Sequence, residues 1–265
     1  MVEEVVQRIA AMTMVTRGEV SADSRAYADK QISTLVEHIV EPVLFARVKL
    51  TQAPDPALRQ PAIAEVAVDI NGDIVRSQVG ASSMGEAIDL LQARLRRKLE
   101  QRAQHRQALR RRAASSPPGE WRHGERPTTR PDFFQRPAEE REVVRHKIHV
   151  THEMTPDEAA FDLEQLDLDF YLFRDIATGD DALLERASDG SYRLARIRNS
   201  TTDSARPVVN PATAERSAPT LRLDEAIERI GAGGERFVFF KNTATGRGSV
   251  LYYRYDGHYG LVTAA

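Results

Sequence analysis

Positively charged side chains crowd one short stretch of this chain. Between Arg94 and Arg112 there are nine lysines and arginines and one acidic residue, Glu100. In a chain whose formal net charge is only −2, such a run is an electrostatic footprint for a polyanion. The chemistry that it predicts is neutralisation of phosphates, which makes binding weaken as the salt concentration rises. The alternative is a solvated helix end, but that alternative favours mixed signs of charge.

Further cations precede this run. Two lie on a predicted helix, two project from one face of a predicted strand, and one lies on a neighbouring strand. A polar strand face is ordinary on a sheet with one solvated side, so these five residues are weaker evidence on their own. The candidate RNA-binding residues are Arg25, Lys30, Arg47, Lys49, Arg76, Arg94, Arg97, Lys98, Arg102, Arg106, Arg110, Arg111 and Arg112.

Residues suited to catalysis or to metal binding form no recognisable site. The chain has no cysteine, which excludes disulfides, thiolate metal sites and a cysteine nucleophile. His146, His149 and His152 are spaced for neither one strand face nor one helical face. The glycines at 231, 233 and 234 end a predicted helix and lack the lysine of a phosphate loop. We therefore expect no enzymatic activity, no metal and no cofactor.

Length and composition set broader limits. A chain of 265 residues with 41% hydrophobic residues is expected to form about two packed domains. It has no apolar run long enough to span a membrane, and Glu3 and Glu4 stand where a signal peptide needs basic residues. These features predict a cytoplasmic protein that does not contact membranes. Residues 148–265 hold 13 basic against 19 acidic residues, so this part is not expected to be the main RNA anchor.

The helices and strands that carry these cations are predicted to form a β-α-β-β-β-α domain over residues 10–106. Apolar spacing predicts helices over residues 22–40 and from Ser83 onward, the second with Glu86 in a capping box. Alternation predicts strands over residues 12–16, 45–51, 63–70 and 73–79, with Asn71-Gly72 as a hairpin turn. A basic, proline-rich linker is expected over residues 107–145.

The rest of the chain repeats itself at an offset of 67 residues. Over residues 155–196 and 222–263, 13 of 42 positions are identical. Copy 1 is expected over residues 146–198, with a helix over 151–166 and strands over 169–174, 182–187 and 192–198. Copy 2 is expected over residues 221–265, after a linker over 199–220. A small unit in tandem usually cannot bury its apolar face alone, so each copy should supply the other's missing half.

Aromatic residues favour the same conclusion. Bulky apolar groups occupy both faces of the predicted copy 2 strands, so both faces should be covered, by the other copy or by another molecule. The expected architecture is α+β, with tandem α-β-β-β repeats that form an internal pseudo-dimer in a monomeric chain. The candidate pairing residues are Phe170, Phe173, Phe237, Phe239, Phe240, Tyr252, Tyr253 and Tyr255.

Three stretches carry a family resemblance: residues 80–106, residues 143–159, and residues 239–262 with Tyr255-Asp256-Gly257-His258-Tyr259. They resemble the long-form ribosome hibernation-promoting factors, in particular a dormancy-associated, actinobacterial type. The resemblance implies that the N-terminal domain binds small-subunit rRNA near the decoding centre and blocks the mRNA and tRNA sites. It implies rRNA and ribosomal proteins as partners. In that family the C-terminal domain is a single copy that pairs between two molecules, whereas here it is duplicated.

The leading hypothesis is therefore a stress-response factor that associates with ribosomes and stores them inactive, as single ribosomes. A second hypothesis is a protein-binding stress regulator, such as a sigma factor modulator, that acts through the C-terminal domain. The first predicts co-sedimentation with ribosomes that salt disrupts, and the second predicts a protein partner and little RNA.

Overall fold

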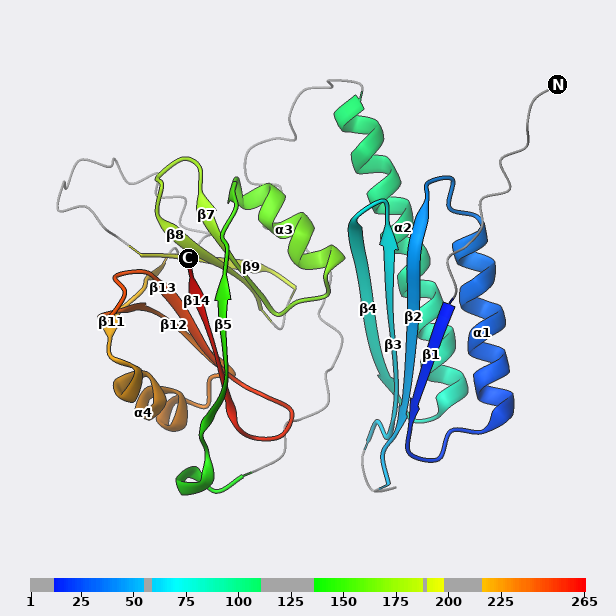
Figure 1. The fold of residues 1–265 in the computed structure, drawn as a ribbon, viewed down its shortest axis with the longest axis horizontal. Helices are drawn as coiled ribbons and strands as arrows, with labels where there is room; N and C mark the ends of the chain where they lie inside the picture. The colour runs from blue at the N-terminus through cyan, green and yellow to red at the C-terminus, as the bar shows by residue number, and fades with distance from the viewer. Residues whose placement is uncertain (1–11, 55–58, 111–135, 188–189, 198–215) are drawn as a thin grey trace. The chain divides into compact units, whose positions relative to one another are not determined.

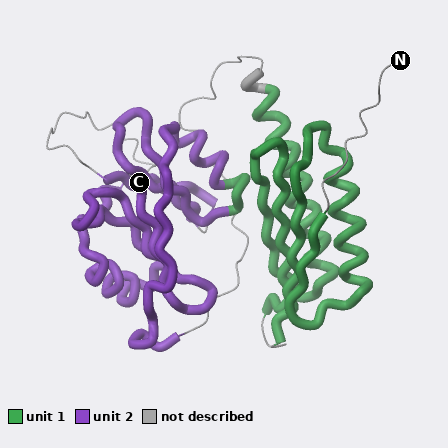
Figure 2. The backbone as a smooth tube through the Cα atoms, viewed as in Figure 1, with its two compact units in different colours: residues 1–115, 128–131, 164–167 green, residues 116–127, 132–163, 168–265 purple. Residues whose placement is uncertain are grey.

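The computed structural model describes residues 12–54, 59–110, 136–187, 190–197 and 216–265. Within them the chain forms two compact units (Figure 2). The first contains the described residues up to 110 together with the short stretch 164–167, and the second contains the remaining residues from 136 onward. No helix in these ranges is both long enough and apolar enough to cross a membrane.

The first unit has the predicted β-α-β-β-β-α order (Figure 1). Its elements are β1 (Met12–Arg17), α1 (Ala22–Glu37), β2 (Val43–Gln52), β3 (Ala62–Ile70), β4 (Asp73–Ala81) and α2 (Met84–Arg110). The strands lie in the order β1-β2-β3-β4, with β1 parallel to β2 and the other pairs antiparallel. Helix α1 ends at Glu37, before the predicted end at residue 40.

Local sequence signals explain where these elements begin and turn. The hydroxyl oxygen of Ser21 accepts a hydrogen bond of 3.1 Å from the Ser24 amide and caps α1. Asn71 and Gly72 have φ angles of 57° and 95°, the left-handed conformation that a tight two-residue hairpin requires. The Glu86 carboxylate accepts hydrogen bonds from the amide and hydroxyl of Ser82 at the start of α2.

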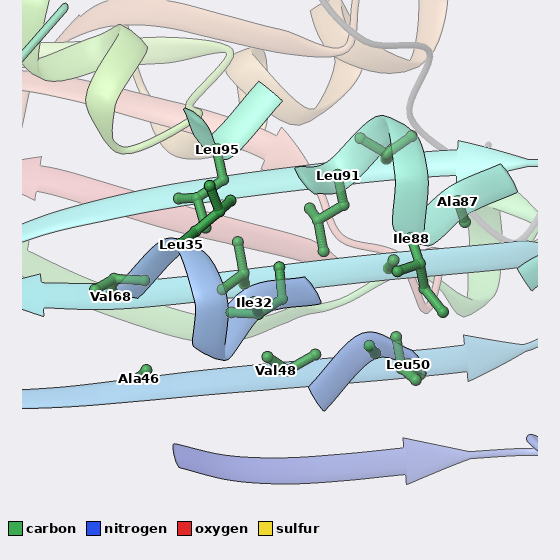
Figure 3. Packing of buried hydrophobic residues seen from close by; sticks show 14 of the residues in the cluster. Ile32, Leu35, Ala46, Val48, Leu50, Val68, Ala87, Ile88, Leu91 and Leu95 are labelled. Carbon is green, nitrogen blue, oxygen red and sulfur yellow. The ribbon is translucent and has the colours of Figure 1, made fainter. Parts of the chain in front are cut away.

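Both helices of the first unit cover the same face of the sheet, and the core lies between the helices and that face. Ile32 and Leu35 of α1 meet Leu91 and Leu95 of α2 above Val48 (Figure 3), and all five are buried. The strands alternate between buried residues on this face and more exposed residues on the other. Among the described residues of this unit, no helix or strand covers that other face, and we call it the uncovered face.

The second unit contains two sheets of five strands each. Copy 1 supplies β6 (Glu153–Met154), α3 (Pro156–Gln165), β7 (Phe170–Asp175), β8 (Asp181–Arg186) and β9 (Tyr192–Arg196). Copy 2 supplies β11 (Thr220–Leu221), α4 (Leu223–Gly233), β12 (Phe237–Asn242), β13 (Gly248–Tyr253) and β14 (Tyr259–Ala264). The tandem α-β-β-β repeat predicted from the sequence is thus confirmed.

Each copy also sends one strand into the other copy's sheet. β5 (Val143–His149) precedes copy 1 but pairs in parallel with β14 of copy 2, while β10 (Arg216–Ser217) precedes copy 2 and pairs with β9 of copy 1. The strand orders are β10-β9-β8-β7-β6 and β11-β12-β13-β14-β5. This exchange was not predicted. Residues 143–145 were assigned to the linker, and the short 3-10 helix η2 (Ala138–Glu140) lies in it as well.

The helix predicted over residues 151–166 begins later than expected, at Pro156. Proline disfavours the helical conformation in the residue before it and is itself well suited to the first helical position. The Glu158 carboxylate accepts hydrogen bonds of 2.8 and 3.0 Å from the amide and hydroxyl of Thr155, which closes a capping box. Residues 153–154 before this cap form β6 instead.

Candidate nucleic-acid interface and pairing surface

The cations of α2 lie on two sides of the helix. Arg94, Lys98 and Arg102 follow one another at a spacing of four beside the leucine row that packs on the sheet. They are buried, with exposed fractions of 7%, 3% and 4%. Arg96 and Arg97 lie on other sides of the helix and are exposed. From the sequence, Arg94, Arg97, Lys98 and Arg102 were all expected to contact RNA, whereas the structure buries three of them and exposes Arg97.

The buried cations are matched by acceptors of the same unit. The Lys98 ammonium donates to the carbonyl of Arg76. The Arg102 guanidinium pairs with Glu41, donates to Asp73 at 2.8 Å and donates to the carbonyl of Ile70 at 3.2 Å. Glu41 also pairs with Arg106, which is half-buried. A buried charge with these partners holds the second half of α2 on the ends of β3 and β4, and removing one partner is costly.

Other predicted cations are exposed and available to a ligand. Arg25 and Lys30 lie on α1, and Arg47 and Arg76 lie on the uncovered face. Lys49 lies on the same face but is half-buried and pairs with Glu65 at 2.7 Å. Arg111, Arg112 and the side chain of Arg110 lie outside the described residues.

Three exposed arginines of the first unit were absent from the predicted set: Arg17, Arg59 and Arg96. Arg17 ends β1, which runs parallel to β2 in a register that places Val15 opposite Lys49 and Arg17 opposite Thr51. Since Met12 and Met14 pack against the core, alternation puts Arg17 on the uncovered face, and this could have been inferred from the strand pattern. The exposure of Arg96 could have been inferred from helical spacing, because Arg96 does not fall on the leucine row that packs on the sheet.

The pairing surface of the two copies is built from the same positions in each. The core that they share contains Leu172, Leu183 and Ile197 of copy 1, and 67 residues later Phe239, Val250 and Ala264 of copy 2. Phe170 and Phe237, also equivalent positions, touch with ring centroids 4.9 Å apart, and Tyr252 lies 5.9 Å from Phe170. A surface on which equivalent residues meet is the mark of a pseudo-twofold dimer.

The remaining aromatic candidates lie elsewhere. Phe240 packs under α4 in the separate core of copy 2. Its equivalent on β7 is Phe173, which is also fully buried. Tyr253 contacts Tyr259 and Arg141, and Tyr255 is 75% exposed. Neighbouring residues of a strand point to opposite faces, so the aromatic residues of β12 are divided between two cores.

The exchanged strand β5 is anchored at its end by an aromatic contact with copy 1. The His149 ring meets Tyr171 of β7 edge-on, with centroids 6.4 Å apart. Burial, with a smaller effect from Lys147, lowers the pKa of His149 below its ordinary value, so the ring is neutral near pH 7. Burial and the nearby Asp162 carboxylate raise the pKa of Tyr171, whose hydroxyl donates to Asp162 at 3.1 Å.

The described histidine, aspartate and glutamate side chains form no group of three that could hold a metal ion.

Both halves of the chain match models of known families. Residues 14–107 match the family described as sigma 54 modulation protein / S30EA ribosomal protein. Residues 138–194 and 207–261 each match the family described as sigma 54 modulation/S30EA ribosomal protein C terminus, so that domain is matched twice.

Individual relatives cover less of the chain. Proteins from two strains of Mycobacterium tuberculosis, each named dormancy associated translation inhibitor, are 38% identical over 128 residues, which is 46% of this chain and 47% of theirs. The match thus spans about half the length of these curated relatives. The N-terminal domain of Thermus thermophilus Protein Y aligns at 24% identity over 35% of this chain and 97% of its own, with a TM-score of 0.29. A ribosomal subunit interface protein from Coxiella burnetii aligns at 16% identity over 35% of this chain and 96% of its own, with a TM-score of 0.28.

Proposed function

We propose, since the chain belongs to the sigma 54 modulation / S30EA ribosomal protein family and within it to the long-form hibernation-promoting factors, that it binds the small ribosomal subunit and keeps ribosomes inactive. The observation that carries this proposal is the set of exposed cations on the first unit. They lie on α1, on the outer side of α2 and on the uncovered face. The mechanism is occlusion: the first unit occupies the region near the decoding centre and keeps mRNA and tRNA out.

The distribution of charge indicates that the two units bind different partners. Phosphate contacts need cations that can reach a backbone, and the first unit presents Arg25, Lys30, Arg47, Arg76 and Arg97 at its surface. The second unit is acidic on balance, so it is less suited to bind the phosphates of rRNA. We therefore assign rRNA binding to the first unit, and pairing, with contacts to ribosomal proteins, to the second.

The structure also refines which residues should contact RNA. Lys98 and Arg102 are buried among acceptors of their own unit, so we assign them to the stability of α2. Arg25, Lys30 and Arg97 become the first choice for phosphate contacts, and Arg17 and Arg96 join them.

Co-sedimentation with ribosomes over a range of salt concentrations tests this assignment. The variant Arg25→Glu, Lys30→Glu, Arg97→Glu should lose binding and reduce the dependence of affinity on salt by roughly one unit of slope for each phosphate that the protein no longer neutralises. The matched control, Arg145→Glu, Arg222→Glu, Arg229→Glu, makes the same change of charge at exposed positions of the second unit. Equal loss of binding in both variants, or no loss in either, would contradict the proposal.

A second experiment addresses how many ribosomes one protein engages. Because both copies of the pairing domain lie in one chain and cover each other, we expect a monomer that inactivates single ribosomes. On sucrose gradients with saturating protein, the single-ribosome peak should persist, and translation in vitro should stop at about one protein per ribosome. A peak heavier than the single ribosome that grows as protein is added would refute single-ribosome storage.

A protein-binding regulator is the second candidate, because the description of the matched family also names sigma 54 modulation. That function would use the second unit and would not need the cations of the first. If the triple variant of α1 and α2 regulates a transcription factor normally while its ribosome binding is lost, this second function is present as well.

A further inference from the structure

A charged contact joins the two copies at a position where they differ. Asp181 opens β8 of copy 1, and the equivalent residue 67 positions later is Gly248, which opens β13 of copy 2. The Asp181 carboxylate accepts hydrogen bonds from Nε and Nη2 of Arg247 at 2.8 and 2.9 Å, and from the amide of Gly248 at 2.8 Å. Residue 181 therefore touches its own equivalent across the pairing surface.

The Asp181 carboxylate of this contact is nearly closed to solvent, whereas the Arg247 side chain is 31% exposed. Position 248 leaves no space for a second side chain. The Asp181 side chain is 3% exposed. A Cβ atom added to Gly248 would lie 3.0 Å from the Cβ of Asp181 and 3.1 Å from a ring carbon of Phe239. Burial alone would raise the pKa of Asp181, but the Arg247 and Gly248 donors outweigh burial and lower it, so the carboxylate is ionised.

The two faces are therefore complementary to each other and not to themselves. The residue of copy 1 that is equivalent to Arg247 is Asp180. If two copy 1 faces met, two Asp181 carboxylates would be buried together, each beside Asp180 where Arg247 now lies. If two copy 2 faces met, two Arg247 side chains would lack the carboxylate, and two glycines would leave a gap. Burying an uncompensated charge is strongly unfavourable.

We propose that Asp181, Arg247 and Gly248 determine the partner of each pairing face, so that copy 1 accepts copy 2 and rejects a second copy 1. The partner that this surface fits is the opposite copy, which the same chain supplies. This inference concerns the isolated protein and does not depend on ribosome binding.

Four full-length variants test the proposal. The acidic variant, Arg247→Asp with Gly248→Asp, gives both copies the residues of copy 1. The basic variant, Asp180→Arg with Asp181→Gly, gives both copies the residues of copy 2. The exchanged variant combines all four substitutions and reverses the pair between copies. The fourth, Asp181→Asn, keeps the shape and removes the charge.

Hydrogen exchange of the backbone amides of β8 and β13 reports on pairing, and the amides of β3 in the same sample serve as a reference. The acidic variant should lose protection by roughly 100-fold or more, the effect of leaving a buried charge unpaired. The basic variant should lose less, because the side chain of Arg247 is 31% exposed. The Asp181→Asn variant should fall between these variants and the wild type. The exchanged variant restores the pair between a carboxylate and a guanidinium and should recover protection in part, because a Cβ at position 248 still lies 3.1 Å from the Phe239 ring, where copy 1 has Leu172. Wild-type protection in the acidic or basic variant, or no recovery in the exchanged variant, would overturn the proposal.

Mixing gives a test that does not rely on stability. The acidic and basic variants present complementary faces to each other, so a mixture should form a one-to-one complex by light scattering, while each variant alone should not. If the mixture contains no complex, or if either variant alone dimerises as readily as the mixture does, the partner choice does not reside in these residues. Loss of ribosome binding, by contrast, would leave this result unchanged.

Discussion

The sheet of the first unit has one covered face, whereas each sheet of the second unit has two. In the first unit, α1 and α2 lie on one face and the other carries Arg47, Lys49 and Arg76. In the second unit, a helix covers one face of the copy 2 sheet and the opposite copy covers the other. The same kind of small α+β module therefore leaves a face open for a ligand in one place and uses that face for pairing in the other.

The difference is visible in the strands. β3 alternates strictly between buried and half-buried residues, as a strand with one wet face does. The first four residues of β13 are buried without interruption, and β8 has the same pattern. The same kind of substitution should therefore change stability by very different amounts in the two units.

The largest effect is expected when an aromatic ring is removed from each kind of face. Phe239→Ala deletes a ring from the shared core and should lower the free energy of unfolding of the second unit by about 3–5 kcal/mol. Phe45→Ala removes the same ring from β2 of the first unit, where it is 39% exposed, and should cost less than about 1 kcal/mol. Denaturant titration of both variants measures the two values. Equal losses would mean that the uncovered face is buried in solution.

A second contrast lies within α2. Arg102→Gln leaves Asp73 without its guanidinium and Glu41 with Arg106 alone, and it should destabilise the first unit by about 2–3 kcal/mol. Arg96→Gln changes an exposed arginine of the same helix and should leave stability within about 0.5 kcal/mol while it weakens ribosome binding. Thermal unfolding and co-sedimentation separate the two roles. The assignment would be wrong if Arg102→Gln lowered ribosome affinity without any loss of stability.

Glycine substitutions extend the comparison at a smaller scale. A Cβ at Gly260 would lie 2.4 Å from Cζ of Tyr252, so Gly260→Ala must displace the ring that packs near Phe170 and should cost about 1–3 kcal/mol. Gly85→Ala in α2 meets nothing within 4 Å and should stabilise the first unit by about 0.5–1 kcal/mol. Opposite signs in the unfolding midpoints are the expected result; a stabilising Gly260→Ala would show that Tyr252 moves without cost.

The smallest effect is a dependence on pH that only the second unit should show through His149. Its pKa is lowered from 6.5 in the folded protein, so the unfolded chain binds the proton first as the pH falls. Stability is therefore complete above about pH 6.5 and declines as the pH falls below it. Unfolding midpoints at pH 7.5 and 5.5 should differ more for the wild type than for His149→Gln. An identical difference in the two proteins would exclude this histidine as the cause.

Much of the fold could be predicted because its signals are local. The Asn71-Gly72 turn, the capping residues and the leucine row of α2 each act within a few residues, and they gave the N-terminal order correctly. The repeat at an offset of 67 residues predicted the two copies and their mutual burial. The exposed or buried state of the α2 cations was missed because Glu41 and Asp73, which neutralise Arg102, are distant in sequence.

The exchanged strands were missed for the same physical reason. β10 has two residues and β5 is exposed along most of its length, so neither shows a strong pattern of its own. Each is held by a sheet edge that belongs to the other copy. Local propensity does not reveal a pairing of this kind, although Val143-Val144 followed by Ile148-His149-Val150 is a weak strand signal.

The exchange of β5 also determines when the second unit can be completed during synthesis. Val143 pairs with Tyr259, which is 116 residues later in the chain. At about 5–20 residues per second, β5 has to wait roughly 6–23 s after its own synthesis before β14 exists. Until then copy 1 lacks the face that covers its apolar side, and β5 is an open strand beside a translating ribosome. The second unit is therefore finished in a single late step, while the first unit, whose strands are all synthesised before residue 82, can fold and acquire its ligand-binding surface well before the protein is released.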